Sequence, residues 1–420
     1  MTTLPPKHVA IIGAGPGGLA LALALHAQSI SCAIYEQRLR SLKIGGAIIL
    51  APNALRVLDA LGLYDKIRMM GFNFENVTFK DESHATMNSF QFGNEHLYGF
   101  SALRISRQTL VHELLTAVED RGIPVRFDAK YSNLISEDES GVSFQFIDGS
   151  IESATLLVGA DGIHSKVRQC MYPSVKPVYS GQLAIISLVR RSMIRFPEGI
   201  DYPLPVVIYG TRGAFLIMPQ DIGGESIHAG TQQAFPERDK LGWDSLASSK
   251  SELTELFNAN LQWWPDVVKS CVEATTPENL TIWPYYFVPK LKHWTSEGGK
   301  VILLGDAAHA IPPTAAQGTC MALEDAYTLA LVLSRPSTQL PLFKALAWWQ
   351  NFRQERIDKV LELTTQLGSL RLSAAERAEL ALQTNQTQDD LIRAAGSDLQ
   401  WLYSANLREE VLSWIEHNGR

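Results

Sequence analysis

The residues best placed to do chemistry lie in the stretch from Val301 to Ala326, which reads VILLGDAAHAIPPTAAQGTCMALEDA. Its first four residues are apolar, which predicts a short buried strand. Asp306 follows at the carboxyl end of that strand, and Pro312 and Pro313 favour an extended turn. A helix is predicted from about Thr314, and free N–H groups at its start would favour anionic or electron-rich ligand atoms. The same pattern also fits a strand–turn–helix in which Asp306 is only a cap.

A second candidate site lies near the N-terminus, where a predicted strand leads directly into the sequence GAGPGG. There Gly13 would permit a tight turn, Gly15 would let the backbone approach a pyrophosphate, and Gly18 would let a helix pack closely on the strand. Glu36 ends the next predicted strand, 23 residues after Gly13, where an acid can bind a ribose hydroxyl. The pattern predicts a dinucleotide site. An acid at this place favours a ribose without a 2′-phosphate, and therefore FAD or NAD rather than NADP.

Three further places allow two interpretations each. The glycines before Gly46 and Ala47 could admit a flat ring against the backbone or could form a bulge. Arg107 follows a predicted helix cap, Ser106, and is either a phosphate-binding guanidinium or a solvated surface charge. Asp161 ends another buried strand and is followed by Gly162, so it resembles the strand end at Asp306 with the residue order reversed.

The elements that must position these residues alternate between strands and helices. Residues 125–153 are predicted to form an antiparallel meander of four short strands, with Asp148-Gly149 as a hairpin turn. From Val178 to Gln232 several alternating strands predict a separate sheet, which could lie over a cofactor. After Pro336 the chain is predicted to be mostly helical, in the segments 342–370, 374–382 and 389–417.

The composition excludes several classes of protein. The chain has 420 residues and a net charge of −7, and no basic run or basic–aromatic stripe indicates a nucleic-acid partner. Its four cysteines are scattered, which argues against a zinc site or a disulfide framework and fits a reducing, cytoplasmic compartment. The apolar stretch around the first glycine loop contains four glycines and a proline, so no transmembrane segment is predicted.

Three motifs stand in order along the chain: GAGPGG with Glu36, GADGIHSKVR at residues 159–168, and GDAAHAIPP at residues 305–313. Together they resemble the single-component FAD-dependent aromatic hydroxylases, the family of para-hydroxybenzoate and salicylate hydroxylases. They are also similar to tetracycline-inactivating and fungal secondary-metabolite monooxygenases. The resemblance covers roughly residues 8–370. It implies an α/β fold with a Rossmann-like FAD-binding domain, an inserted β-sheet substrate domain and C-terminal helices.

The resemblance also implies domain boundaries and residue roles. The expected parts are a first FAD-binding segment (1–177), a substrate-binding sheet (178–290), a second FAD-binding segment (291–370) and a C-terminal helical segment (371–420). By resemblance, the first glycine loop meets the FAD pyrophosphate, Glu36 the ribose, Arg107 the phosphates and Asp306 the ribityl chain. The flavin ring is expected beside Gly46 and Ala47 and against the backbone from Ala315 to Gly318, which includes Ala316. The second motif, with Asp161, Ser165 and Arg168, is expected to help FAD and the nicotinamide cofactor bind. A carbonyl of Pro312 or Pro313 is expected next to the oxygen-reacting carbon.

Three departures from the family pattern stand out. Ala316 and Cys320 occupy positions that usually hold glycine and asparagine, and Cys320 is expected to be a small buried residue. An arginine that binds anionic phenols or carboxylates often stands five residues after a glycine on the first strand of the substrate sheet. Counting from Gly181, that position is Ile186. A larger, neutral substrate is therefore expected.

The implied activity is a monooxygenase reaction in which NADPH or NADH reduces FAD and dioxygen forms a flavin hydroperoxide. One oxygen atom then passes to a neutral aromatic or polycyclic small molecule. Such chemistry needs a dry cavity, with an apolar wall expected from Ile185, Leu188, Phe215, Ile217 and Met218. An ordinary sheet core also fits half of these residues, since alternate positions on a strand face opposite ways. Polar candidates for the cavity are Gln182, Tyr209, His228 and Tyr285, of which Tyr209 and His228 could assist loss of a phenol proton. The alternatives are a non-catalytic FAD-binding protein or another flavin oxidoreductase of this fold. Whether the chain is a monomer or a homodimer stays open.

Overall fold

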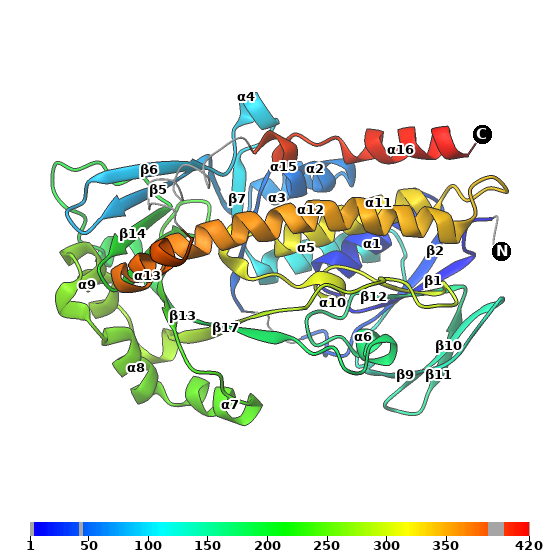
Figure 1. Ribbon diagram of the computed structural model, residues 1–420, viewed down its shortest axis with the longest axis horizontal. Coiled ribbons are helices and arrows are strands. Elements are labelled where there is room, and N and C mark those ends of the chain that lie inside the picture. The colour runs from blue at the N-terminus through cyan, green and yellow to red at the C-terminus, as the bar shows by residue number, and fades with distance from the viewer. Residues whose placement is uncertain (1–3, 42–44, 385–398, 420) are drawn as a thin grey trace.

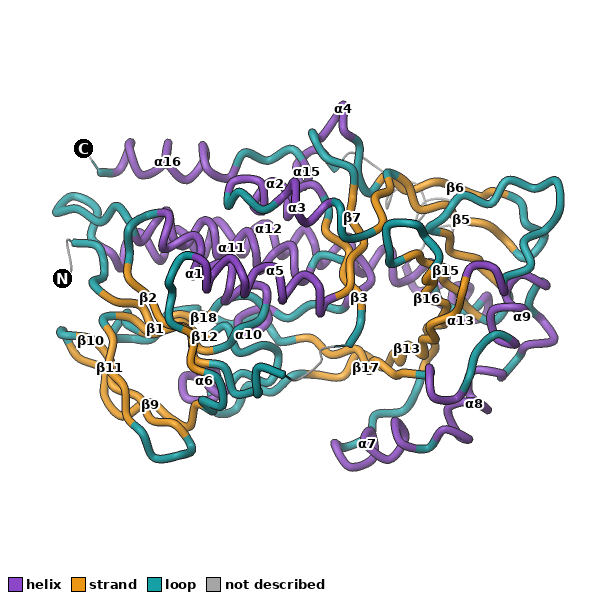
Figure 2. The backbone as a smooth tube through the Cα atoms, turned by 180° about the vertical axis from the view of Figure 1, so that it is seen from behind, coloured by secondary structure: helices purple, strands orange, loops and turns teal. Residues whose placement is uncertain are grey.

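The computed structural model describes residues 4–41, 45–384 and 399–419. A five-stranded parallel sheet forms the centre of one half of the molecule. Its order is β18 (Val301–Leu303), β12 (Leu156–Gly159), β1 (His8–Ile12), β2 (Ser31–Tyr35) and β8 (Val125–Arg126). Helices α1 (Pro16–Ala27), α5 (Arg107–Asp120) and α11 (Gly318–Leu333) lie on one side of this sheet (Figures 1 and 2). This is the predicted Rossmann-like arrangement.

An antiparallel sheet covers the other side of the parallel sheet (Figure 1). It consists of β9 (Tyr131–Asp138), β10 (Gly141–Phe146) and β11 (Ile151–Ala154), and the predicted turn at Asp148-Gly149 joins β10 to β11. The prediction that residues 125–127 belong to this meander is wrong, because β8 pairs in parallel with β2 instead. A two-residue strand carries too little periodicity to reveal its partner.

A seven-stranded sheet dominates the other half of the molecule (Figure 2). Its order is β17 (Thr281–Phe287), β13 (Val178–Arg190), β16 (Ser226–Ala234), β15 (Gly213–Pro219), β14 (Val206–Gly210), β5 (Asn76–Asp81) and β6 (Thr86–Gln91). The strands β5 and β6 come from outside the range 178–290 predicted for this sheet, and they join it through a parallel pairing of β5 with β14.

The two faces of the seven-stranded sheet have different neighbours. Its back face packs against α7 (Lys240–Ser248), α8 (Lys250–Asn258) and α9 (Asp266–Glu273). Ile185, Phe215 and Ile217 belong to that back-face core, so for these three residues the alternative of an ordinary sheet core holds and a place in a wall facing the cofactor does not. Side chains alternate along a strand, and Tyr209 and Met218 therefore face the FAD-binding half and join its core.

Shorter elements link the two halves. A small sheet contains β3 (Ala47–Leu50), β7 (Ala102–Ser106) and β4 (Phe72–Phe74). The short helices are α2 (Pro52–Ala60), α3 (Tyr64–Arg68), α4 (Glu95–Tyr98), α6 (Lys166–Met171) and α10 (Asp306–His309). Single 3₁₀ turns occur at Arg191–Met193, Leu261–Trp263, Pro277–Asn279 and Pro313–Ala315.

Helix α12 (Leu342–Leu370) runs the length of the molecule and connects its halves (Figure 1). Its carboxyl end contacts the 3₁₀ turn that begins at Pro313, and the chain continues into α13 (Ala374–Thr384). The predicted helix at 389–417 is interrupted, because its described part forms α15 (Gln400–Tyr403) and α16 (Leu407–Asn418), while residues 389–398 lie outside the described residues. Among the described helices, none combines the length and the apolar character needed to cross a membrane.

Candidate functional site

The three sequence motifs meet at the carboxyl ends of neighbouring parallel strands, β1, β12 and β18. A β-carbon on Gly13 would lie 2.5 Å from the carbonyl oxygen of Ala160, so the first and second motifs are in direct contact. The guanidinium of Arg168 donates 2.9 Å to the carbonyl of Ala307, which joins the second motif to the third. Ligands of open α/β sheets bind at this edge.

The first glycine loop has the geometry that its sequence predicts. Gly13 has a φ of +109°, which favours glycine. A β-carbon on Gly18 would lie 2.1 Å from the carbonyl oxygen of Gly13, so only glycine allows α1 to pack this closely. By contrast, a β-carbon on Gly15 would meet no atom within 4 Å. The loop is therefore closed where it packs on the sheet and open where a ligand would approach.

Glu36 supports the same loop from the end of β2. Its carboxylate accepts hydrogen bonds from the backbone N–H of Ala14 at 2.7 Å and of Arg38 at 2.9 Å. The side chain is only 8% exposed. A carboxylate has about four acceptor positions, so two hydrogen bonds leave it able to accept a further donor such as a ribose hydroxyl.

Asp306 begins α10 directly after Gly305, whose φ of +59° and ψ of −137° turn the chain sharply at the end of β18. The Asp306 side chain is exposed, and within the described residues no protein donor bonds to its carboxylate. Surrounding protein atoms nevertheless displace enough water to raise the pKa of this carboxyl, and the charges of His309 and Arg107 offset only part of that rise. Asp306 thus presents acceptor oxygens to a ligand.

The turn from Pro312 to Gly318 leads from α10 into α11. Pro312 is half-buried and Pro313 is exposed, and Thr314 and Ala315 are buried. Ala316 has a φ of +55°, the left-handed conformation that glycine adopts most easily. This backbone conformation explains why glycine is expected at position 316, and the alanine holds it under strain. Gly318 starts α11, and a β-carbon there would lie 3.9 Å from Oδ1 of Asp306.

Arg107, Gly46 and Trp283 form a group beside these motifs. The Arg107 backbone N–H donates 3.0 Å to the Gly46 carbonyl, and its guanidinium lies 4.9 Å from the centre of the Trp283 ring. The Nε atom of Arg107 is buried without a hydrogen-bond partner among the described residues. Burial lowers the pKa of Arg107, and Asp306 opposes the shift. Ala47 follows as the first residue of β3.

Asp161 contacts the start of α6. Its Oδ2 accepts from the backbone N–H of Lys166 at 2.7 Å and of Val167 at 3.2 Å, and burial raises its pKa. Ser165 caps the same helix through the N–H of Arg168. The Oδ1 atom of Asp161 is buried and finds no partner in the described part of the chain. The second motif thus holds the start of α6 in place and leaves Oδ1 of Asp161 available to a further donor, as far as the described residues show.

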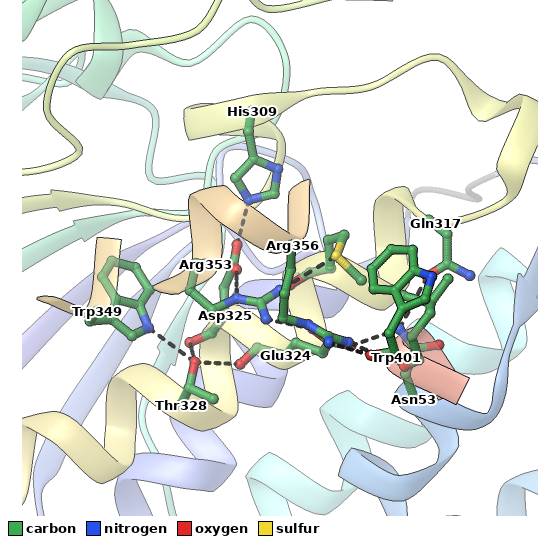
Figure 3. Close-up of polar contacts among 12 residues, drawn as sticks. Asn53, His309, Gln317, Glu324, Asp325, Thr328, Trp349, Arg353, Arg356 and Trp401 are labelled. Atoms are coloured by element: carbon green, nitrogen blue, oxygen red, sulfur yellow. Dashed lines mark hydrogen bonds and ion pairs between the residues drawn. The ribbon is translucent and has the colours of Figure 1, made fainter. Parts of the chain in front are cut away.

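A buried ionic network that the motifs did not predict supports the loop around Asp306 (Figure 3). Asp325 accepts from the backbone N–H of Gly305 at 3.1 Å, from His309, and from Arg353 at 2.7 Å. Glu324 accepts from Arg353, from Arg356 and from Asn53 at 2.7 Å. Burial alone would raise the pKa of both carboxyls, but the attached cations hold both values below their usual range.

The signal for this network was available in the sequence. Glu324 and Asp325 interrupt an otherwise apolar helix, and both are fully buried in α11. Buried carboxylates need cationic partners. The partners could not be identified from the sequence because Arg353 and Arg356 lie in a different helix, α12.

The front face of the seven-stranded sheet brings together some of the predicted substrate residues. Tyr209 pairs across the strands with Ala214, and Ala214 pairs with Gln232, which lies 3.5 Å from Gln182. The Oε1 atom of Gln232 accepts from Arg371 at 3.4 Å, and the charge of Arg371 acts on both Tyr209 and Tyr285. Arg371, which caps α12, was not predicted.

His228 lies apart from that cluster. It stands four residues before Gln232 on β16, roughly 13 Å away at the usual rise of a strand. Its Nδ1 lies 3.1 Å from the guanidinium of Arg104, a second arginine that the sequence did not single out. Burial, with help from Arg104, lowers the pKa of His228 to about 3. The imidazole is therefore neutral at pH 7.

Cys320 is fully buried in α11, with its Sγ 3.7 Å from the carbonyl oxygen of Ile49. Burial raises the pKa of this thiol to about 12. A thiol in this state is inert, which agrees with the prediction of a small buried residue.

Comparison with known proteins gives one consistent result. A family model described as an FAD binding domain matches residues 7–190 and 290–339. The 6-hydroxynicotinate 3-monooxygenase of Bordetella bronchiseptica is 28% identical over 360 residues, covering 84% of this chain and 89% of that protein. Hispidin-3-hydroxylase of Neonothopanus nambi is 28% identical and covers 84% of this chain and 86% of its own length.

Among solved structures, Klebsiella pneumoniae HpxO in complex with FAD and uric acid has a TM-score of 0.75 at 25% identity. The match covers 93% of this chain and 95% of that protein. CtdE in complex with FAD and its substrate has the same fold, with a TM-score of 0.79 at 20% identity and 98% of each chain covered. With the three motifs meeting at one sheet edge, these matches show that the chain belongs to the family of FAD-dependent aromatic monooxygenases.

Proposed function

We propose that the protein uses NADPH or NADH to insert one oxygen atom of dioxygen into a neutral aromatic or polycyclic small molecule. The observation that carries the proposal is the meeting of the three motifs at one edge of the parallel sheet. Arg371 connects the turn after the third motif, at Thr314, to Gln232 on the front face of the seven-stranded sheet. This arrangement leaves acceptors and donors open to an extended dinucleotide on one side, and a partly apolar surface on the other.

The residues present fit FAD. Gly15 has open space, Asp306 has a carboxylate that no described protein donor occupies, and the buried Nε of Arg107 has no partner among the described residues. We therefore propose that FAD extends from the first glycine loop to the turn before α11. The proposed contacts are Gly13, Gly15, Gly18 and Glu36 at the adenosine end, Arg107 and Asp161 beside the phosphates, Asp306 at the ribityl chain, and Gly46, Ala47, Ala316 and Gly318 around the ring.

FAD, when bound, supplies the redox chemistry by the oxygen-transfer route that the family resemblance implies. The chain itself has to orient the substrate and exclude water. We propose that a carbonyl of Pro312 or Pro313 contacts the reacting region and that Tyr209 assists the loss of a phenol proton from the substrate. His228 is proposed as a neutral hydrogen-bonding residue on the same face, held by Arg104.

A neutral substrate is supported by the position of Ile186. This residue is opposite Gly230 on β16 and Thr281 on β17, so no charge stands at that point of the front face. The prediction of a substrate without a carboxylate rests on this position.

The test is reduction of the purified flavoprotein by NADPH and by NADH without oxygen, followed by turnover with ¹⁸O-labelled dioxygen in a metabolite extract. The expected result is bleaching of the flavin by at least one nicotinamide and one labelled oxygen atom in a product. A flavin that neither nicotinamide reduces, or a product whose new oxygen comes from water, would contradict the proposal.

A further inference from the structure

A hydrogen bond between Arg104 and His228 connects two sheets of the molecule. Arg104 lies in β7, the central strand of the small sheet, where its backbone is fixed between Ile49 on one side and Phe72 on the other. His228 lies in β16 of the seven-stranded sheet. The Nη2 atom of Arg104 is 3.1 Å from Nδ1 of His228. The bond thus joins the strand that leads to Arg107 to the front face of the seven-stranded sheet.

The chemistry of the two side chains determines which ring nitrogen of His228 carries the proton. A guanidinium has donors only, so Nδ1 of the imidazole accepts the bond and cannot hold a proton. The neutral ring therefore carries its proton on Nε2. Burial and the charge of Arg104 lower the pKa of His228 to about 3, so the ring stays neutral well below pH 7. A bond donated to Nδ1 also polarises the ring and strengthens Nε2–H as a donor.

The neighbours of His228 on the sheet are apolar. They are Leu188 on β13 and Met218 on β15, and among the described residues Arg104 is the charged group that shifts the pKa of His228. The His228 side chain is half-buried, and its Nε2 atom forms no hydrogen bond with the described chain. The ring therefore presents one N–H donor to a ligand and is not a base at pH 7.

A flat apolar strip extends from His228 to Gln232 along the front face. Gly230 stands midway on β16 without a side chain, and its cross-strand neighbours, Ile186 and Leu216, are half-buried. His228 and Gln232 point to the same face and mark the ends of the strip, roughly 13 Å apart at the usual rise of a strand. An extended ring system that lies along this strip can reach His228 with an acceptor oxygen.

We propose that Arg104 is a positioning residue that holds His228 as the Nε2–H tautomer, and that His228 is a specificity-determining residue that donates to a carbonyl oxygen of the substrate. The inference rests on the proposed function and narrows its substrate to an extended ring system with a neutral acceptor, such as an aryl or ring ketone. No proton is transferred in this contact, because the N–H bond of His228 stays intact. An analogue without the oxygen would leave the donor unpaired, which disfavours its binding.

The first measurement determines the tautomer directly. FAD-loaded protein with ¹⁵N-labelled histidine rings is followed by NMR between about pH 5.5 and pH 8, and the signals of His228 are assigned by their loss in His228→Phe. We expect Nε2 to be protonated and Nδ1 to be unprotonated over this whole range. Arg104→Met should raise the pKa of the ring and populate the other tautomer. Arg104→Lys keeps a donor and should retain the wild-type tautomer.

The second measurement tests the substrate class with two probes of similar shape, 2-acetylnaphthalene and 2-isopropenylnaphthalene, of which only the first has a carbonyl oxygen. Calorimetric titration of the FAD-loaded protein gives the affinity for each probe. We expect the wild type to bind the ketone about 10-fold more tightly, and His228→Phe should lose this preference. Arg212→Gln removes an exposed arginine from the turn between β14 and β15 and should change neither the tautomer nor the preference.

Three results would overturn the assignment: a wild-type His228 ring that is protonated at Nδ1, equal affinities of the wild type for the two probes, or a preference for the ketone that survives in His228→Phe. The first result needs only the wild-type tautomer, so it decides the matter even if Arg104→Met does not fold. Failure of both nicotinamides to reduce the flavin, with the tautomer and the preference intact, would refute the proposed function and leave the binding role of His228 in place.

Discussion

The individual carboxylates of the proposed site differ in how many hydrogen-bond donors of the protein they bind. Asp325 and Glu324 are buried and fully occupied by cations and N–H donors, whereas Asp306 presents its oxygens without a protein donor in the described chain. Glu36 is intermediate, with two backbone donors and capacity for more. The unoccupied acceptors are the ones that a ligand can use.

Replacing Asp306 by alanine is expected to yield a largely colourless protein, because the proposed ribityl contact is lost while the fold is kept. The measurement is the ratio of flavin to protein absorbance after purification, with circular dichroism as the check on folding. A yellow variant with unchanged FAD affinity would show that the ribityl contact has been assigned to the wrong residue.

For Glu36→Ala we expect FAD binding to weaken by about 1.5–3 kcal/mol, the usual contribution of a charge-assisted hydrogen bond. Fluorescence titration of the apoprotein with FAD measures this change. Glu36→Gln is the matched control, since an amide keeps the size and one acceptor and should lose less. Equal FAD affinities for the alanine variant and the wild type would contradict the proposed contact between Glu36 and the ribose.

The lowered pKa of His228 in the folded protein predicts how the stability of the protein depends on pH. Its pKa is lowered from 6.5 to about 3 in the folded protein, so below pH 6.5 the unfolded chain takes up a proton that the folded protein does not. Stability should therefore fall as the pH decreases from 6.5 towards 3, by up to about 1.4 kcal/mol per pH unit from this group. Chemical denaturation of the wild type and His228→Gln at several pH values tests this. Parallel curves for the two proteins would contradict the prediction.

At the scale of elements, backbone strain concerns the turn between α10 and α11, which is proposed to lie against the flavin ring. This turn contains Ala316 with a positive φ, and α10 before it begins after Gly305, whose φ is also positive. The strain at Ala316 resides in the backbone, one residue before Gln317, which caps the start of α11.

Ala316→Gly is expected to stabilise the folded protein by up to about 1.6 kcal/mol. Relief of left-handed strain is worth roughly 1–2 kcal/mol, and the greater freedom of glycine in the unfolded chain offsets about 0.4–1 kcal/mol of it. The thermal midpoint of the apoprotein is the measurement. Ala315→Gly, one residue earlier with a negative φ, is the control and should destabilise. If both variants shift the midpoint in the same direction, strain at Ala316 is not the cause.

At the scale of the whole molecule, α12 couples the two halves. Its central arginines hold the ionic network beneath the Asp306 loop, and its carboxyl end places Arg371 on the front face of the seven-stranded sheet (Figures 1 and 3). One helix thus orients the cofactor side and the substrate side relative to each other.

Replacing Arg353 by methionine should therefore affect the entire protein. It leaves Glu324 and Asp325 without their shared cation, and breaking a buried ion pair in this way costs about 3–5 kcal/mol. We expect a large fall in the unfolding midpoint and loss of FAD. Arg195→Met removes exposed ion pairs with Asp266 and Glu273 and should cost no more than about 1 kcal/mol. Similar losses in both variants would mean that the network contributes little.

The amino-acid sequence by itself determined the local features. The first glycine loop, Glu36 at the end of β2, Ser106 as a cap, the hairpin at Asp148-Gly149 and the limits of α12 all follow from short-range patterns of glycine, charge and hydrophobic period. Three ordered motifs were sufficient to indicate the family, because each needs only neighbouring residues to be recognised. The residue roles at the cofactor remain predictions.

Only the tertiary structure decided which distant segments meet. It joined β5 and β6 to a sheet formed mainly by residues 178–287, placed β8 in the parallel sheet, and turned Ile185, Phe215 and Ile217 away from the cofactor side. It also brought Arg371 to Gln232, which lies 139 residues earlier in the chain. Such contacts depend on packing between elements, and local periodicity contains no information about which partner a strand end or a helix end will find.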